Sequence, residues 1–289
     1  MGEKLTSFFE QYMQKESFFK DKAVLLSGYK PEIMPHRDPE IEKIASILAP
    51  ALKLERPSNL FIYGTTGTGK TVVVNYITSN MTEIAQKANN NLKIYTINCK
   101  LKKVADTEYR LIADVARTMF NQEIPETGLS TNEVYKIFVN ALDKEKILLV
   151  MVLDEIDSLV DKIGDGLLYS LTRLNSELKN SQISIIGISN KLDFTDHMDA
   201  RVKSSLCEEE LQFFKYNAVQ ILDILKERAG VAFKEGKIAE GVLEKCAAYA
   251  ATHGDARRAI DLLRVSAELT ERKNENIILT LEDETGTIK

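Results

Sequence analysis

The chain has 289 residues, 44% of them hydrophobic, and carries a formal net charge of −5 with a pI near 5.5. This length is enough for one large domain and one small domain, each with its own core. The acidic balance provides no molecule-wide attraction for nucleic acid, so any DNA binding requires a local basic patch.

The three cysteines, Cys99, Cys207 and Cys246, lie far apart and form no C-x-x-C pair. Their spacing favours buried thiols in a reducing compartment over disulfides or a zinc site. No apolar run is long enough to span a bilayer, and the first residues lack the apolar core of a signal peptide. We therefore expect a cytoplasmic protein that uses neither zinc nor a membrane.

The first part of the chain reads as an arm followed by a proline-rich segment. Residues 5–28 mix aromatic and charged positions, which predicts a short helix and an extended arm that pack on the main domain. Pro31, Pro35 and Pro39 then hold the chain in an extended path suited to lining a pocket. A helix is expected over residues 40–54, whose apolar positions share one face.

The most informative stretch lies between a predicted strand at residues 60–63 and a predicted helix from residue 70 to about 88. It matches the pattern G-x-x-x-x-G-K-T in the strand-loop-helix context that a phosphate-binding loop requires. Glycines let backbone N–H groups surround phosphate oxygens, and the helix N-terminus faces the same anion. Lys70 can reach the β and γ phosphates of a nucleoside triphosphate, while the Thr71 hydroxyl takes a place on Mg²⁺. The alternative is a plain turn, against which the four fixed positions argue. The loop consists of Gly64, Thr65, Thr66, Gly67, Thr68, Gly69, Lys70 and Thr71.

Strands and helices alternate along the rest of the first two thirds of the chain. Alternation of this kind predicts an α/β fold with a parallel, doubly wound sheet, whose ligand lies at the carboxyl ends of the strands. Ser130 and Glu133 have the spacing of a capping box. The predicted strands cover residues 92–98, 147–153, 183–189 and 210–214, and the predicted helices cover 107–120, 131–142 and 167–178.

Asp154 and Glu155 directly follow an apolar run of seven residues. We expect Asp154 to end a strand that runs beside the phosphate-loop strand, where its carboxylate would hold the Mg²⁺ shell. Strand alternation would turn Glu155 the other way, where it can take a proton from an attacking water. The alternative is a surface turn, which so long an apolar run disfavours. Asp157 and Asp161 read as solvated helix charges.

Two further polar residues are candidates for contact with the γ phosphate. Asn190 ends the predicted strand 183–189 and could orient the water through its amide, although Asn is also a common strand terminator. From Tyr216 onward only helical patterns follow, which predicts a small helical domain. Arg257 opens the last of its helices and could lay its guanidinium on the γ phosphate when the two domains close. The alternative for Arg257 is a solvent-exposed helix start.

Four segments together resemble the AAA+ ATPases, namely the phosphate loop, Leu153–Asp157, Ile188–Asn190 and Gly254–Arg257, in the places of Walker A, Walker B, sensor 1 and sensor 2. Their flanks resemble the archaeal replication initiators, relatives of the largest origin-recognition subunit and of the eukaryotic helicase-loading protein. The resemblance covers about residues 24–270. It rests on Tyr29, Pro31, Pro35, His36 and Arg37, on Ser58–Gly64, on Pro125–Ser130, and on Asp199–Leu206 with Glu208–Glu210.

The resemblance implies a slow, Mg²⁺-dependent ATPase that binds ATP or ADP, marks replication origins and helps recruit the replicative helicase. Double-stranded origin DNA, the helicase and other initiator subunits would be its partners, at the nucleoid. His36 and Arg37 would line the base and ribose side of the site. Tyr216 and Arg228 would contact the nucleotide from the lid, with a hinge-packing aromatic as the alternative for Tyr216. The expected parts are an N-terminal arm (1–28), an AAA+ nucleotide-binding α/β domain (29–214), a helical lid domain (215–275) and a loose C-terminal end (276–289).

In this family a helical insertion, here at about residues 102–130, touches DNA. A lysine cluster can equally be a solvated surface. The residues that would supply phosphate-contacting charge are Lys100, Lys102, Lys103, Arg110 and Arg117.

The sequence departs from the family pattern in two places. The Ser-Arg-Phe of an arginine finger reads Ser204-Ser205-Leu206 here, with Arg201 and Lys203 as the nearby cations, so we expect slow hydrolysis and an ATP/ADP switch. After residue 275 the chain also lacks the room for the family's C-terminal winged-helix domain. Two other functions stay open: an AAA+ module that only holds ATP, and an oligomeric remodeller of the clamp-loader or transposition type, against which Ser205 argues.

Overall fold

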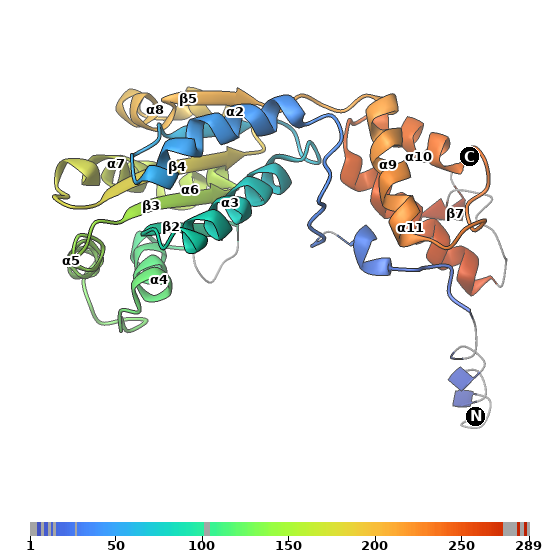
Figure 1. The fold of residues 1–289 in the computed structure, drawn as a ribbon, viewed down its shortest axis with the longest axis horizontal. Coiled ribbons are helices and arrows are strands. Elements are labelled where there is room, and N and C mark those ends of the chain that lie inside the picture. Colours follow the sequence, from blue (N-terminus) through green and yellow to red (C-terminus); the bar gives the residue numbers. More distant parts are fainter. Residues whose placement is uncertain are drawn as a thin grey trace. The chain divides into compact units, whose positions relative to one another are not determined.

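The computed structural model describes residues 5–6, 9–10, 13, 16–26, 28–100, 105–273, 282–283 and 286–287. The chain divides into two compact units. We call residues 36–215 the sheet unit, and residues 1–35 together with 216–289 the helical unit. Figure 1 labels the elements of both units. The division after residue 215 lies next to the boundary expected after residue 214, but residues 29–35, expected in the nucleotide-binding domain, fall in the helical unit.

A five-stranded, all-parallel sheet forms the centre of the sheet unit. This arrangement confirms the predicted doubly wound α/β fold. The strands follow the order β2-β3-β4-β1-β5, so β4 separates β3 from β1. The expectation that the strand of Asp154 runs beside the phosphate-loop strand is therefore wrong. β4 is the central strand, and seven of its eight residues are buried. The strands are β1 (Leu60–Tyr63), β2 (Leu92–Asn98), β3 (Leu148–Asp154), β4 (Gln182–Ser189) and β5 (Glu209–Gln212).

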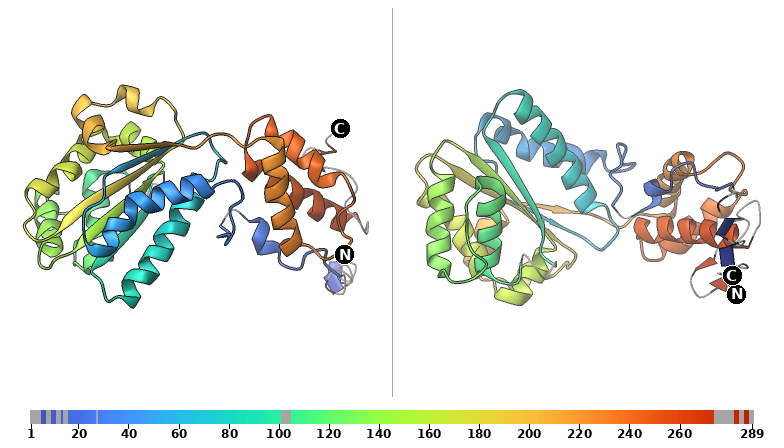
Figure 2. Two further views of the ribbon diagram at one scale, coloured as in Figure 1. Left: turned by 45° about the horizontal axis from the view of Figure 1, so that its top comes forward. Right: turned by 90° about the horizontal axis from the view of Figure 1, so that it is seen from below.

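Helices cover both faces of this sheet. Figures 1 and 2 show α2 (Asp38–Leu48) and α3 (Lys70–Lys87) on one face. On the other face, alternate β3 residues such as Leu149 and Met151 share one apolar core with the remaining helices. These are α4 (Glu108–Phe120), α5 (Thr131–Leu142), α6 (Ile156–Ile163), α7 (Gly166–Arg173) and α8 (Ala200–Leu206). Of the 3₁₀ turns, η2 (Ala49–Lys53) follows α2, η3 (Leu174–Ser176) follows α7, and η4 (Phe194–His197) precedes α8.

Local capping sets several of the helix boundaries. Ser130 and Glu133 form the predicted capping box at the start of α5, where the Ser130 hydroxyl accepts from the Glu133 N–H and the Glu133 carboxylate accepts in return. Asn217 and Gln220 make a second such box at the start of α9 (Ala218–Ala232). The predicted helix over 167–178 ends earlier, because α7 stops at Arg173 and continues as η3.

The helical unit contains α9, α10 (Val242–Ala251) and α11 (Ala256–Arg272), packed around a core of its own. Two short strands follow, β6 (Glu282–Asp283) and β7 (Gly286–Thr287), which pair antiparallel within the segment expected to be a loose end. Among the residues that the structure describes, no helix has both the length and the apolar character needed to cross a membrane.

The N-terminal arm belongs to the helical unit, which corrects the expectation that it packs on the main domain. Phe19 makes an antiparallel bridge to Phe233 after α9, and the two rings lie 5.0 Å apart. The Lys20 N–H donates to the Ala232 carbonyl at 2.8 Å. The arm continues as η1 (Lys22–Leu25), whose apolar residues complete the core of the helical unit. Aromatic residues in the sequence indicated burial but not which core would bury them.

This packing predicts that the arm stabilises the helical unit. Phe19 is 8% exposed, so Phe19→Ala should cost about 3 kcal/mol of unfolding free energy through lost burial and a residual cavity. Leu26→Ala, at a residue of the same arm that is 49% exposed, is the matched control and should change little. Differential scanning calorimetry measures both. An unchanged melting temperature for Phe19→Ala would contradict the assignment of the arm to this core.

Candidate nucleotide-binding site

The phosphate loop joins β1 to α3 and depends on its glycines. Gly67 and Gly69 have φ values of 77° and 89°, in the left-handed region that favours glycine. Gly64 allows a close approach, because a Cβ at this position would lie 2.4 Å from the Phe213 carbonyl oxygen. The loop therefore turns sharply against the end of β5 and presents its backbone at the start of α3.

The loop closes around the ammonium of Lys70. This side chain is 5% exposed, and its Nζ donates to the Gly64 carbonyl at 2.8 Å and to the Thr65 carbonyl at 2.9 Å. The Thr68 hydroxyl donates to the same Thr65 carbonyl at 2.8 Å. The predicted lysine is thus placed inside the loop, within reach of any anion that the loop binds.

Arg37 braces the loop from outside. Its Nε donates to the Thr68 carbonyl at 3.1 Å, and its Nη2 donates to the Phe214 carbonyl at 2.7 Å. Nη1 pairs with Glu40, and the guanidinium lies 5.0 Å from the centre of the Phe213 ring. The structure therefore gives Arg37 a supporting contact with the phosphate loop, while its expected place beside the base and ribose stays a prediction. His36, the residue before it, is exposed at the edge of the sheet unit.

Thr71 and Asp154 meet at the carboxyl edge of the sheet. The Thr71 Oγ1 lies 3.1 Å from Asp154 Oδ1 and 3.2 Å from Oδ2. They meet although β4 separates their strands, because α3 leads from β1 to β2 and its first turn passes the end of β3. Burial raises the pKa of Asp154, and the nearby Glu155 charge raises it further, whereas the Thr71 hydrogen bond opposes the shift. A hydroxyl and a carboxylate that is costly to keep charged are a donor set that fits Mg²⁺.

Glu155 does not turn away from Asp154. Its φ of 53° lies outside the strand region, so strand alternation does not apply to it, and the expected opposite orientation is wrong. The Asn98 Nδ2 lies 3.4 Å from Asp154 Oδ2 and 3.5 Å from Glu155 Oε1. The Lys100 ammonium lies 3.6 Å from Glu155 Oε2. Both carboxylates therefore lie within reach of one amide group.

Asn98 is a site residue that the sequence analysis did not single out. It ends β2 and pairs in register with Asp154 at the end of β3. A polar residue at the end of a predicted parallel strand can indicate a site residue. The sequence does not show which strands are neighbours, so it does not indicate that Asn98 lies beside Asp154.

Asn190 lies at the same edge. Ser189 pairs in register with Tyr63, the last residue before the phosphate loop. The Asn190 N–H donates to Asp157 Oδ1 at 3.4 Å. Its side-chain amide makes no hydrogen bond with the described residues, so this group is available to a ligand.

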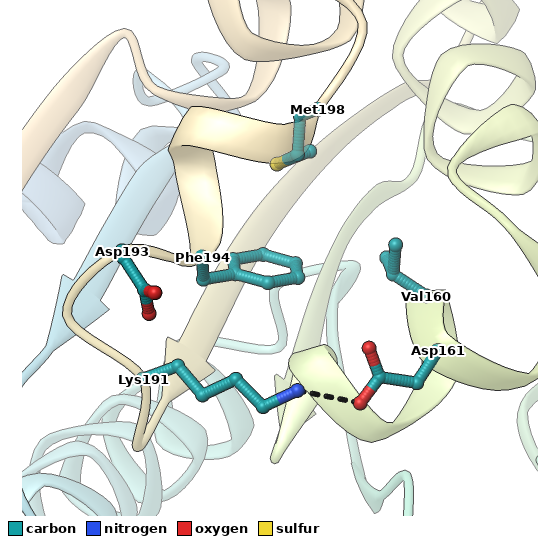
Figure 3. A pocket seen from close by; sticks show the side chains of 6 residues that line it. All are labelled: Val160, Asp161, Lys191, Asp193, Phe194 and Met198. Carbon is teal, nitrogen blue, oxygen red and sulfur yellow. Dashed lines mark hydrogen bonds and ion pairs between the residues drawn. The ribbon is translucent and has the colours of Figure 1, made fainter.

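Asp157 corrects another expectation, because it is 7% exposed and not a solvated charge. The Ser189 hydroxyl donates to its Oδ1 at 2.9 Å. Asp161, one turn further along α6, is exposed as expected and pairs with Lys191 at 2.6 Å. Asp161 and Lys191 both line a pocket, whose other lining residues are Val160, Asp193, Phe194 and Met198, and Figure 3 shows their side chains in direct contact.

The remaining expected nucleotide contacts lie in the helical unit. Tyr216 is buried in the core of this unit, as its packing alternative requires. Arg228 is also buried. Its Nη1 donates to the Val24 carbonyl at 3.2 Å, its guanidinium lies 4.5 Å from the centre of the Tyr29 ring, and burial lowers its pKa. Arg257 is exposed in the first turn of α11. The nucleotide contacts of these three residues stay predictions.

The expected DNA-contacting residues differ in their surroundings. Lys100 and Arg110 are exposed, although each has an acidic partner: Glu155 for Lys100, and Asp106 for Arg110 at 3.4 Å. Arg117 instead donates through Nε to the Ile124 carbonyl at 2.8 Å and holds the loop after α4. Lys102 and Lys103 lie outside the described residues.

The segment Ser204-Ser205-Leu206, which stands where the family pattern has an arginine finger, lies in α8. Leu206 is fully buried, and the Ser205 hydroxyl donates to the Arg201 carbonyl at 2.9 Å. The Arg201 guanidinium makes two hydrogen bonds to Asp199, both at 3.0 Å, and these bonds lower the pKa of Asp199 to about 2. Arg201 of this helix is therefore already paired with Asp199, two residues before it.

Comparisons with known proteins agree with this geometry. Residues 53–194 match a family described as an AAA domain, and residues 222–282 match the Cdc6 AAA+ ATPase-type lid domain. The ORC1-type DNA replication proteins of Methanoregula boonei and Thermococcus onnurineus are 50% and 48% identical to the chain, over 92% and 93% of its length. The chain covers 64% and 65% of these two relatives, slightly less than two thirds.

Solved structures show the same relationship. The Aeropyrum pernix ORC1 protein in complex with DNA is 42% identical, with a TM-score of 0.83 over 91% of this chain and 67% of that chain. Cdc6p from Pyrobaculum aerophilum, 24% identical over 91% of this chain and 69% of that chain, shares the fold with a TM-score of 0.77. The chain therefore belongs to the ORC1/Cdc6 family of AAA+ ATPases.

Proposed function

We propose that this chain is the ATP-dependent switch of a DNA replication initiator, which binds ATP with Mg²⁺, hydrolyses it slowly and acts at replication origins. The observation that carries the proposal is the contact between Thr71 and Asp154. It brings the phosphate loop and the carboxylates after β3 to one edge of the sheet, in a chain about half identical to ORC1-type replication proteins.

Each of these residues at the carboxyl edge of the sheet has a role in phosphoryl transfer. The backbone N–H groups from Gly64 to Thr71 and the Lys70 ammonium hold the β and γ phosphates of ATP or ADP. Thr71 and Asp154 hold Mg²⁺, which when bound neutralises charge that develops on the phosphates. Glu155 takes a proton from the attacking water, and the free amide of Asn190 orients that water or contacts the γ phosphate.

The nucleotide contacts expected of residues in the helical unit remain part of this proposal. Arg257 supplies charge to the γ phosphate from the exposed start of α11, while Tyr216 and Arg228 support the nucleotide from the lid. His36 and Arg37 lie on the base and ribose side, and Arg37 also keeps the loop in shape through the Thr68 carbonyl.

Hydrolysis is slow because no arginine of α8 is free to stabilise the transition state. A finger supplied from a neighbouring subunit is worth about 10³ to 10⁵ in rate. In α8 that position holds Ser205, and Arg201 is held by two hydrogen bonds to Asp199. A chain that keeps ATP bound for long periods is suited to act as a switch between ATP and ADP states.

DNA is the proposed partner of the insertion at residues 102–130. The A. pernix ORC1 structure at 42% identity contains DNA, which supports a DNA-bound role for this chain. The exposed side chains of Lys100 and Arg110 supply local positive charge that the acidic chain as a whole does not. The replicative helicase and other initiator subunits are the further partners expected from the family, in the cytoplasm at the nucleoid.

A second candidate is an AAA+ module that holds ATP without turning it over. It is favoured by the contacts of Glu155, whose carboxylate lies within reach of both Asn98 and Lys100. A carboxylate held in this way is a poorer base until the contacts are released.

Single-turnover hydrolysis separates the two candidates. If Glu155 is the base, Glu155→Gln should lower the rate by about 10² or more while ATP affinity changes little, because the loop is unaltered. Asp161→Asn, at an exposed carboxylate of the same helix, is the control and should hydrolyse ATP as the wild type does. Lys70→Ala should not bind ATP. Equal rates for wild type and Glu155→Gln would favour the holding module.

Binding to origin and random duplexes over a range of salt concentrations tests the DNA function. We expect a preference for origin DNA, and Arg110→Ala should weaken binding and reduce the slope of log K against log salt by about 1. Lys53→Ala removes an exposed charge from η2, beside α2 and α3, and is the matched control. Equal affinity for both duplexes would remove the initiator function even if ATP is bound.

A further inference from the structure

Asp157 is buried, although it has no part in the chemistry described above. Asp157 lies in the first turn of α6 and is 7% exposed. A buried carboxylate is stable only when hydrogen bonds or opposite charges satisfy it. Its partners therefore indicate what it does.

One oxygen of Asp157 organises the turn that leaves β4. Its Oδ1 accepts from the Ser189 hydroxyl at 2.9 Å and from the Asn190 N–H at 3.4 Å. The Ser189 hydroxyl oxygen in turn accepts from the Lys191 N–H at 3.0 Å. Three consecutive residues at the end of β4 are thus fixed, directly or through Ser189, by a side chain from another element.

Asp157 also lies close in the chain to Glu155, the proposed base. Glu155 is the N-cap of α6, two residues before Asp157, so both side chains project from the same tight turn. β4 lies between β3 and β1, which places Asn190 at the edge between Asp154 and the phosphate loop. Asp157 therefore sets the spacing between the turn that carries Glu155 and the strand end that carries Asn190.

A second connection runs parallel to the first but is weaker. The ion pair between Asp161 and Lys191 joins the same two elements one helical turn further on, at the mouth of the pocket in Figure 3. Both of its side chains are largely exposed, and exposed pairs contribute little to stability. The hydrogen bond from the Ser189 hydroxyl to the Asp157 carboxylate is buried, and a hydrogen bond to an ionised acceptor is stronger than one between neutral groups. The connection through Asp157 is therefore the one that holds Asn190 in place.

We propose that Asp157 is a positioning residue for ATP hydrolysis, which acts by fixing Asn190 relative to Glu155. The inference rests on the proposed ATPase function. Asp157 accepts from the backbone N–H of Asn190, whose side-chain amide makes no hydrogen bond with the described residues.

The test compares ATP affinity and single-turnover rate in four variants: Asp157→Ala, Asp157→Asn, Asn190→Ala and the double variant Asp157→Ala with Asn190→Ala. Asp161→Ala, which removes only the exposed pair, is the matched control on the same helix. Asp157→Asn keeps an oxygen that can accept from Ser189 and Asn190, so it separates hydrogen-bond geometry from charge.

We expect Asp157→Ala to lower the rate about tenfold, as Asn190→Ala does, with ATP affinity within about threefold of wild type. The double variant should be no slower than Asn190→Ala alone, because both changes remove the same group from action. Asp157→Asn should recover most of the rate, and Asp161→Ala should keep it. Wild-type turnover in Asp157→Ala, or additive losses in the double variant, would overturn the proposal. A loss of ATP affinity equal to the loss of rate would also overturn it.

Hydrogen exchange of the Asn190 amide tests the connection without nucleotide. Exchange at this amide should accelerate about tenfold or more in Asp157→Ala and less in Asp157→Asn, because the carboxylate acceptor is removed or only replaced. Ser189→Ala is the second variant, to be used if Asp157→Ala does not fold. Unchanged exchange in these variants would overturn the connection. Absence of turnover in the wild type with the expected exchange pattern would instead sink the proposed ATPase function.

Discussion

The hydrogen bond between the Thr71 hydroxyl and the Asp154 carboxylate is the contact on which the rest of the site depends. It joins the phosphate loop after β1 to the acidic pair after β3, two strands that are not neighbours. Without this contact the loop would be a site for an anion only. With it, the Thr71 hydroxyl and the Asp154 carboxylate would hold a metal ion next to the phosphate loop, and the ion would supply positive charge there.

The order of the strands explains why the remaining residues fall into place. β4 occupies the centre of the sheet and ends beside Tyr63, so Asn190 arrives between the loop and the acidic pair. β2 ends in register with Asp154 and brings Asn98 from the opposite side. Glu155 leaves the strand with a left-handed backbone and stays within reach of Asn98. Four segments far apart in the sequence thereby converge on one edge.

Features that the sequence predicted well are those set by local chemistry. The glycines of the phosphate loop, the apolar run before Asp154 and the capping box at Ser130 each carry their own structural requirement, so their placement needed no knowledge of neighbours. The features that could not be predicted from the sequence depend on contacts between distant segments. The burial of Asp157 follows from the Ser189 hydroxyl 32 residues away, the contact of Arg37 with the loop follows from Thr68, and the arm packs on α9 because Phe233 lies there.

The account is tested most directly by the Mg²⁺ dependence of ATP affinity, measured by calorimetry with Mg²⁺ or with EDTA for wild type, Thr71→Ala and Asp154→Asn. If the two oxygens share one metal ion, Mg²⁺ should tighten ATP binding to the wild type by about tenfold or more, and this gain should disappear in both variants. The same gain in all three proteins would contradict the claim that the contact between Thr71 and Asp154 forms the metal site.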